Sequence, residues 1–144
     1  MRKIETSIEI DASAECVWDI LKESQFYRDW NPFIVLVEGE MVKGRSIKIT
    51  VVPPGAQPMK FKPRILRADF PELRWKGKLL FNGLFDGEHY FKVESRPDGK
   101  CLFIHGEIFS GILVGFLKTA LEKTKLGFEK MNQSLKLKAE NSGT

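Results

Sequence analysis

Residues 113–135 have the sequence LVGFLKTALEKTKLGFEKMNQSL, in which the apolar positions recur at intervals of three and four. This spacing is typical of one apolar stripe along an amphipathic helix, which we expect to span residues 112–138. Charged residues such as Lys118, Glu122 and Lys125 fall on the opposite side. A single long helix with a single apolar stripe can bury that stripe against one sheet.

The region before this helix predicts such a sheet. Residues 3–10 alternate apolar and polar side chains, as a half-buried strand does. Two short helices should follow, the first capped by Ser13 and the second covering residues 24–30. Six further strands are expected at residues 33–39, 46–52, 59–68, 73–80, 84–94 and 100–109. The short turns between these strands favour an antiparallel meander curved around the helix.

Length and composition limit the class of protein. The 144 residues suffice for one domain, expected over residues 1–138, with residues 139–144 as a disordered tail. The formal net charge of +4 is mild, and no apolar run reaches the roughly 18 residues of a membrane span. Two cysteines, Cys16 and Cys101, are too few for a disulfide framework or a metal site. We therefore expect a cytoplasmic chain without membrane insertion, cofactor or metal.

Three segments carry recognisable motifs. Residues 8–18 (IEIDASAECVW) have the pattern I-x-I-x-A-x-x-x-x-V-W, residues 27–33 (YRDWNPF) have Y-x-x-W-N-P-F, and residues 105–111 (HGEIFSG) have H-x-E-x-F-x-G. Together they resemble the START-like superfamily, the SRPBCC group that includes polyketide cyclases and plant pathogenesis-related allergens.

The resemblance implies a helix-grip fold of class α+β. In that fold a seven-stranded curved antiparallel sheet surrounds the long C-terminal helix, with two short helices after the first strand. It also implies a cavity for an apolar ligand between sheet and helix. Members of the superfamily include lipid carriers, hormone receptors, aromatase/cyclases and hydrolases, so the fold does not select among these functions.

A turn predicts which residues of the last two strands face each other. Residues 97–99, Pro-Asp-Gly, predict a three-residue hairpin loop with Gly99 in the left-handed conformation. The resulting pairs on one face are Val93–Phe103, Phe91–His105 and His89–Glu107. We expect this face to point inward because two phenylalanines share it.

His89, His105 and Glu107 would then form a polar cluster among aromatic side chains. They could hydrogen-bond the head group of a ligand, or a histidine could act as an acid or base oriented by Glu107. The interpretation that we favour is a satisfied structural His–Glu pair in an otherwise apolar wall. Metal binding is not expected, because two ligands on one strand and one opposite are loosely placed. The sequence contains no nucleophile elbow and no glycine-rich phosphate loop, so no residue is assigned a catalytic role.

Aromatic residues make up 11% of the chain, and they could line a cavity or fill a solid core. Gly77 and Gly106 within strands leave room, and Gly127 removes bulk from the helix, which indicates a close approach or a void. We favour a cavity. The residues expected to line it are Trp30, Phe33, Phe61, Trp75, Phe81, Phe85, His89, Phe91, Phe103, His105, Glu107, Phe109, Phe116, Leu117 and Leu121.

A basic surface is expected on the outside of the sheet. Pairing residues 59–68 with residues 73–80 would bring together Lys60, Lys62, Arg64, Arg74, Lys76 and Lys78. This face could bind an anionic partner weakly, or it could be a solvated face that deters edge aggregation. Nucleic-acid binding is not expected, because interleaved exposed aromatic residues are missing.

The sequence leads to one main functional hypothesis and two alternatives. We expect the protein to bind or carry a small apolar ligand, lipid-like or aromatic and polyketide-like, with a carbonyl or hydroxyl held by His89, His105 or Glu107. The first alternative is an enzyme of the polyketide cyclase or dehydratase type that uses a cavity histidine. The second is an interaction module that uses the basic face.

Overall fold

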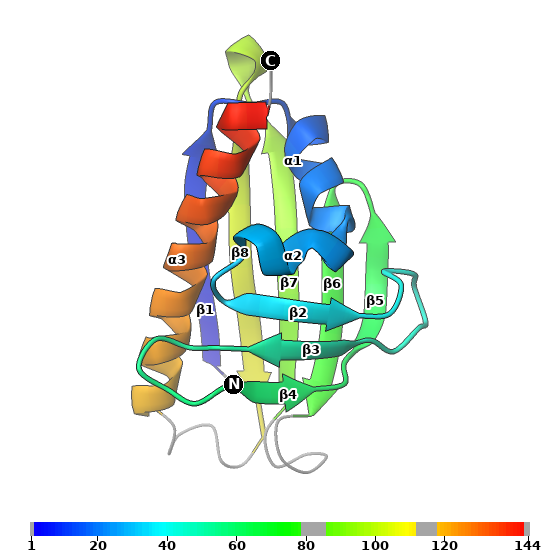
Figure 1. Ribbon diagram of the computed structural model, residues 1–144, viewed down its shortest axis with the longest axis vertical. Helices are drawn as coiled ribbons and strands as arrows, with labels where there is room; N and C mark the ends of the chain where they lie inside the picture. The colour runs from blue at the N-terminus through cyan, green and yellow to red at the C-terminus, as the bar shows by residue number, and fades with distance from the viewer. Residues whose placement is uncertain (1, 79–85, 112–117, 143–144) are drawn as a thin grey trace.

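The computed structural model describes residues 2–78, 86–111 and 118–142, and its elements follow the predicted order (Figure 1). The strands are β1 (Arg2–Ile10), β2 (Ile34–Glu38), β3 (Lys48–Val51), β4 (Met59–Phe61), β5 (Arg64–Asp69), β6 (Glu72–Lys78), β7 (Asp86–Ser95) and β8 (Cys101–Ser110). The helices are α1 (Ala14–Lys22), α2 (Tyr27–Trp30) and α3 (Lys118–Ser142), with short 3-10 turns η1 (Ser24–Phe26) and η2 (Pro97–Gly99). Within these residues no helix is both long and apolar enough to cross a membrane.

The strands form two antiparallel sheets. The larger sheet has the order β1-β8-β7-β6-β5 and the smaller one the order β2-β3-β4. In Figure 1 the strands of the smaller sheet run across those of the larger sheet, and α3 lies along the side of β1 and β8. The buried apolar side chains of both sheets and the helices form one core cluster. The predicted class, α+β with a long C-terminal helix packed on a curved antiparallel sheet, is confirmed.

One expected strand is divided in two. The chain leaves β4 at Phe61 and enters β5 at Arg64. Pro63 between them has no N–H to donate, and its carbonyl accepts a hydrogen bond from the N–H of Ile47 (2.9 Å). β4 pairs with β3, whereas β5 pairs with β6. The described residues therefore form eight strands in two sheets, where the sequence predicts seven in one.

The two short helices are joined by a buried hydrogen bond. Ser13 caps α1 as predicted, because its Oγ accepts a hydrogen bond from the N–H of Cys16 (3.1 Å). Leu21 of α1 and Tyr27 of α2 are both fully buried. The hydroxyl of Tyr27 donates to the carbonyl of Leu21 (2.6 Å), which fixes α2 against the end of α1.

α3 extends further than the sequence predicts. The helix continues to Ser142 because its last turns are held to the N-terminal part of the chain. Ala139 is fully buried, and the carboxylate of Glu140 accepts a hydrogen bond from the N–H of Asp11 (2.9 Å). The expected disordered tail is therefore wrong for residues 139–142. Residues 112–117, the expected start of this helix, lie outside the described residues, as do residues 79–85.

Close packing of α3 on the chain before β2 depends on a glycine. A Cβ atom at Gly127 would lie 2.3 Å from Cδ1 of Phe33. The same phenylalanine packs edge-on against Phe128, with 5.4 Å between ring centroids. Gly127 therefore permits a close approach between helix and ring, which is one of the two roles that the sequence allows.

Gly127→Ala is expected to destabilise the protein. Alanine favours the helix by about 1 kcal/mol, but the added methyl group must displace a buried ring, and overpacking a core typically costs about 1–3 kcal/mol. Because the added atom would overlap two ring carbons of Phe33, we expect a cost of about 2–3 kcal/mol and hence a net fall of about 1–2 kcal/mol in the free energy of unfolding, measured with urea. Gln133→Ala on the exposed side of α3 is the control and should change it by less than about 0.5 kcal/mol. Unchanged or increased stability of Gly127→Ala would show that the helix has room for a side chain.

Candidate functional site

The hairpin between β7 and β8 has the predicted register. Asp98 and Gly99 both adopt left-handed conformations, with φ of 65° and 75°, and the N–H of Arg96 donates to the carbonyl of Lys100 (2.8 Å). The pairs Val93–Phe103, Phe91–His105 and His89–Glu107 form as the sequence predicts. Since His89 and His105 are only 5% and 0% exposed, this face points into the protein.

A cavity of about 240 Å³ lies between the two sheets and α3. A single water molecule needs only about 10–15 Å³, so the interior is not packed solid. The described residues that line the cavity are Phe33, Ile34, Ile49, Val51, Pro53, Met59, Phe61, Pro63, Trp75, Gly77, His89, Glu107, Phe109, Ala120, Leu121 and Thr124. The wall is thus mostly apolar and combines residues that are far apart in the sequence.

The structure places part of the predicted ligand-binding set at this wall. The members that line the cavity are Phe33, Phe61, Trp75, His89, Glu107, Phe109 and Leu121. Phe91, Phe103 and His105 are instead fully buried in the core, and Trp30 packs edge-on against Tyr27 with 5.3 Å between ring centroids. None of these four is among the described residues that line the cavity. Phe81, Phe85, Phe116 and Leu117 lie outside the described residues.

A chain of hydrogen bonds leads from the cavity wall to the interface with α3. Glu107 Oε1 lies 3.3 Å from His89 Nδ1, and His89 Nε2 lies 2.8 Å from His105 Nε2. His105 Nδ1 lies 2.9 Å from Oδ1 of Asn132 on α3. The Nδ2 group of Asn132 donates to Oγ1 of Thr6 on β1 (2.8 Å). Four elements therefore meet in one polar network inside an apolar core.

Burial keeps this network uncharged. It lowers the pKa of His89 from 6.5 to about 3. It also lowers the pKa of His105 well below 6.5, and the neighbouring His89 adds to this effect. The pKa of Glu107 is raised by burial from 4.5 to about 8. At neutral pH the network therefore holds two neutral imidazoles and a neutral carboxylic acid.

The ring nitrogens of the two histidines are all engaged within the network. None is left free to coordinate a metal ion or to take a proton from a ligand. In the described parts of the chain, no group of three or more His, Cys, Asp or Glu side chains is arranged to hold a metal ion. His89 and Glu107 both line the cavity, and because both ring nitrogens of His89 are engaged, the carboxyl group of Glu107 is the polar group that the network presents there.

Sequence reasoning missed two kinds of site residue. Asn132 lies on the apolar stripe of α3, directly after Met131 and three residues before Leu135, and a polar residue at that position is a recognisable signal. Ile49 and Val51 line the cavity from the smaller sheet. Their alternation shows that they share a face of β3, but it does not show that this sheet lies over the larger one.

The predicted basic face does not form as expected. Lys60 belongs to β4 and lies opposite Thr50 in the smaller sheet, so it is not beside β6. Lys62 lies between β4 and β5. Arg64 and Lys76 do face each other across β5 and β6. The division of the strand at Pro63 is the reason that the set is separated.

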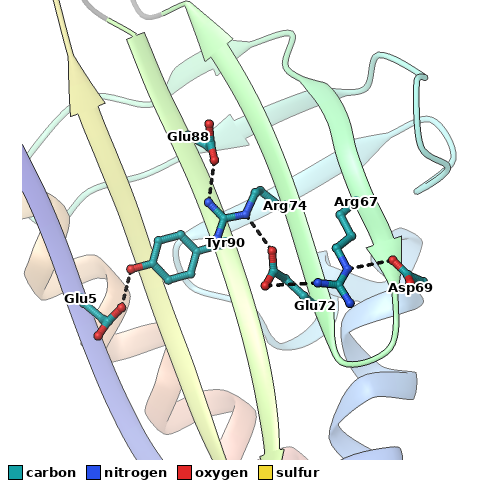
Figure 2. Close-up of polar contacts among 7 residues, drawn as sticks. All are labelled: Glu5, Arg67, Asp69, Glu72, Arg74, Glu88 and Tyr90. Atoms are coloured by element: carbon teal, nitrogen blue, oxygen red, sulfur yellow. Dashed lines mark hydrogen bonds and ion pairs between the residues drawn. The ribbon is translucent and has the colours of Figure 1, made fainter. Parts of the chain in front are cut away.

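Two arginines of this surface, Arg67 and Arg74, alternate with carboxylates, as Figure 2 shows. Arg74 forms ion pairs with Glu72 (2.8 Å) and Glu88 (2.6 Å). Arg67, which a bulge in β5 brings opposite Arg74, pairs with Asp69 (2.9 Å) and Glu72 (3.6 Å). Because carboxylates neutralise these two arginines, Arg67 and Arg74 offer an anionic partner less than the sequence suggests.

Tyr90 occupies the same outer surface. Its ring lies across β8, and its hydroxyl donates a hydrogen bond to Glu5 of β1 (Figure 2). A Cβ atom at Gly106 of β8 would lie 2.3 Å from the hydroxyl oxygen of Tyr90. The expectation that Gly106 leaves room for a ligand is therefore wrong, since this glycine makes room for Tyr90.

A long helix held by curved antiparallel strands, with an apolar cavity between them, defines a helix-grip protein with an internal site. A family model described as polyketide cyclase / dehydrase and lipid transport matches residues 1–140, and the chain belongs to this family. The resemblance to the START-like superfamily is thereby confirmed. No curated protein sequence matches the chain.

Several solved structures share the fold. An aromatase/cyclase from a Streptomyces species has 15% identity and a TM-score of 0.76, with 99% of both chains covered. Norcoclaurine synthase from Thalictrum flavum, in complex with dopamine and hydroxybenzaldehyde, has 15% identity and a TM-score of 0.76, covering 99% of this chain and 88% of that one. A START superfamily protein from Mycobacterium smegmatis has 16% identity and a TM-score of 0.73, covering 97% of this chain and 98% of that one. At such identities the likeness shows the fold alone.

The stability of the protein should depend on pH through this network. The pKa of Glu107 in the folded protein, about 8, lies above its ordinary 4.5, so its stabilising contribution is complete below pH 4.5 and is lost as the pH rises through 8. The pKa of His89 is shifted in the opposite direction, from 6.5 to about 3, so stability is lost as the pH falls from 6.5 toward 3. Because the pKa of His105 is lowered as well, the two histidines outweigh Glu107 between pH 4.5 and 6.5, and we expect maximal stability near pH 6.5.

Glu107→Gln isolates the alkaline side of this profile, because glutamine cannot ionise. Urea unfolding at pH 6.5 and pH 8 should show a decline in the wild-type protein that the variant lacks. Glu94→Gln, on the exposed end of β7, is the matched control and should keep the decline. The account of a neutral buried carboxyl group is contradicted if wild type and Glu107→Gln respond to pH alike.

Proposed function

We propose that the protein binds a small, mostly apolar molecule in the cavity between its two sheets and α3. The composition of the cavity wall carries this proposal, because His89, Glu107 and Thr124 are the only polar residues among its described members. Apolar cavities with a few placed polar groups are typical of small-molecule sites. Each 100 Å² of apolar ligand surface buried there would contribute about 2.5 kcal/mol.

The family supports a ligand of this kind, since its description covers polyketide cyclases, dehydrases and lipid transport. The complex of norcoclaurine synthase with dopamine and hydroxybenzaldehyde gives one example of aromatic molecules bound by a protein of this fold. By analogy, we propose that the ligand of this protein is lipid-like or aromatic. Its two thiols, Cys16 and Cys101, are free, which agrees with a reducing compartment such as the cytoplasm.

A cyclase or dehydratase is the second candidate. It is favoured by the carboxylic acid of Glu107 at the wall, because a group with a pKa of about 8 can transfer protons near neutral pH. Binding without catalysis has the stronger support, because the proton of Glu107 is engaged by His89 and the histidine nitrogens are engaged with one another. An enzyme that uses this network would lose turnover in both His89→Ala and His105→Ala.

Val51→Trp is expected to abolish ligand binding by filling the cavity. Val51 lies in β3 at the cavity wall and is 8% exposed, so a larger side chain there projects into the open volume. The neutral dye N-phenyl-1-naphthylamine should bind wild-type protein at one site in a fluorescence titration. In Val51→Trp its affinity should fall at least about tenfold, which corresponds to about 1.4 kcal/mol.

Thr50→Trp is the matched control for this experiment. Thr50 is the neighbouring residue of β3, and its side chain points to the opposite face of the strand, so dye binding should be unchanged. Equal loss in both variants would indicate a general effect of tryptophan on the sheet. The proposed function is contradicted if the wild-type protein binds no dye and carries no co-purifying small molecule in native mass spectrometry.

A further inference from the structure

We propose that the ligand presents a hydrogen-bond donor, such as a phenol or alcohol hydroxyl, to the cavity-facing oxygen of Glu107. Ligands whose polar group is only an acceptor, such as a ketone, should be disfavoured at this point of the wall. The inference rests on the proposed ligand-binding function and names the chemistry of the ligand's polar group. It follows from the donor and acceptor roles along the chain of hydrogen bonds that runs from Thr6 through Asn132 and the two histidines to Glu107.

Thr6 sets the direction at the far end of the network. Its hydroxyl carries one proton, which it donates to the backbone carbonyl of His105 (3.1 Å). Oγ1 of Thr6 can therefore only accept from Asn132, whose Nδ2 amide group lies 2.8 Å away. The carbonyl oxygen of the same amide, Oδ1, faces Nδ1 of His105 at 2.9 Å. Because that oxygen is an acceptor, His105 carries its proton on Nδ1.

This proton determines the tautomers of both histidines. A neutral imidazole has a proton on one nitrogen only, so Nε2 of His105 is an acceptor. His89 must then donate from its own Nε2 across the 2.8 Å contact, which leaves Nδ1 of His89 as an acceptor. Oε1 of Glu107, 3.3 Å away, therefore supplies the proton of the last hydrogen bond. The lowered pKa values of the histidines and the raised pKa of Glu107 agree with this assignment.

The second oxygen of Glu107, Oε2, is consequently an acceptor. The carboxyl proton is directed from Oε1 toward His89, and within the described residues no group donates to Oε2. The Glu107 side chain lines the cavity and is 12% exposed, so its free oxygen is available to a ligand.

Two neighbouring residues determine how the test must be designed. Thr124 donates its hydroxyl proton to the carbonyl of Ala120 (2.8 Å), so it also offers only lone pairs. Trp75 contributes an indole ring to the wall, and its N–H is a donor. The contribution of Glu107 must therefore be isolated by substitution of that residue.

The test compares 2-naphthol with 2-fluoronaphthalene, which has nearly the same shape but no donor, by calorimetric titration at pH 6.5. We expect 2-naphthol to bind the wild-type protein about five- to tenfold more tightly, the effect of one net hydrogen bond. Glu107→Leu should remove this preference while 2-fluoronaphthalene still binds. Glu94→Leu, the same substitution at an exposed position of β7, should retain the preference.

Glu107→Gln tests the direction of the network itself. In the proposed direction the glutamine amide donates to Nδ1 of His89 and turns its oxygen to the cavity, so 2-naphthol stays the preferred ligand. In the reversed direction the amide NH2 group would face the cavity and favour 2-acetylnaphthalene, a carbonyl acceptor. A switch of preference to 2-acetylnaphthalene would overturn the inference.

Failure of this inference differs from failure of the proposed function. Equal binding of 2-naphthol and 2-fluoronaphthalene to the wild-type protein would overturn the inference and leave ligand binding in place. Absence of binding by both compounds and by the dye would overturn both. If Glu107→Leu fails to fold, as its circular dichroism spectrum would show, the Glu107→Gln measurement decides alone.

Discussion

The hydrogen bond between His89 and His105 constrains the chemistry of everything around it. The two rings meet through their Nε2 atoms at 2.8 Å, so one must donate and the other must accept, and two charged rings would repel each other strongly there. Aromatic neighbours exclude water, since His105 stacks on Phe128 with 3.9 Å between centroids and His89 stacks on Trp75 at 5.1 Å. The pair is therefore stable only when both rings are neutral. Glu107, which is hydrogen-bonded to His89, connects the pair to the cavity wall.

This constraint also positions the C-terminal helix. Asn132 reaches His105 only when α3 presents one particular side to the sheet, and Thr6 completes the network only in the observed register of β1 and β8. A buried polar group left without its partner costs about 1–3 kcal/mol. A rotated helix would leave several such groups unsatisfied at once. The polar network thus specifies how the helix lies on the sheet, while the apolar stripe supplies most of the attraction.

The parts of this arrangement that could be predicted depend on local rules. The loop at residues 97–99 determines strand register, so His89 could be placed opposite Glu107 from the sequence. The parts that could not be predicted depend on contacts between distant elements. Pro63 marks an irregular strand, but only the packing of the smaller sheet decides that the chain changes sheets there. Similarly, Gly106 and Gly127 show that something approaches closely without identifying Tyr90 and Phe33 as the neighbours.

The protonation of the two imidazole rings determines which hydrogen bonds Glu107 can make, and nitrogen-15 NMR measures it directly. Protonated and bare ring nitrogens have distinct chemical shifts, and the chain contains only two histidines, so long-range proton–nitrogen spectra at pH 6.5 can be assigned. We expect two neutral rings, with the proton on Nδ1 of His105 and on Nε2 of His89. A charged ring, or a bare Nδ1 on His105, would contradict this expectation.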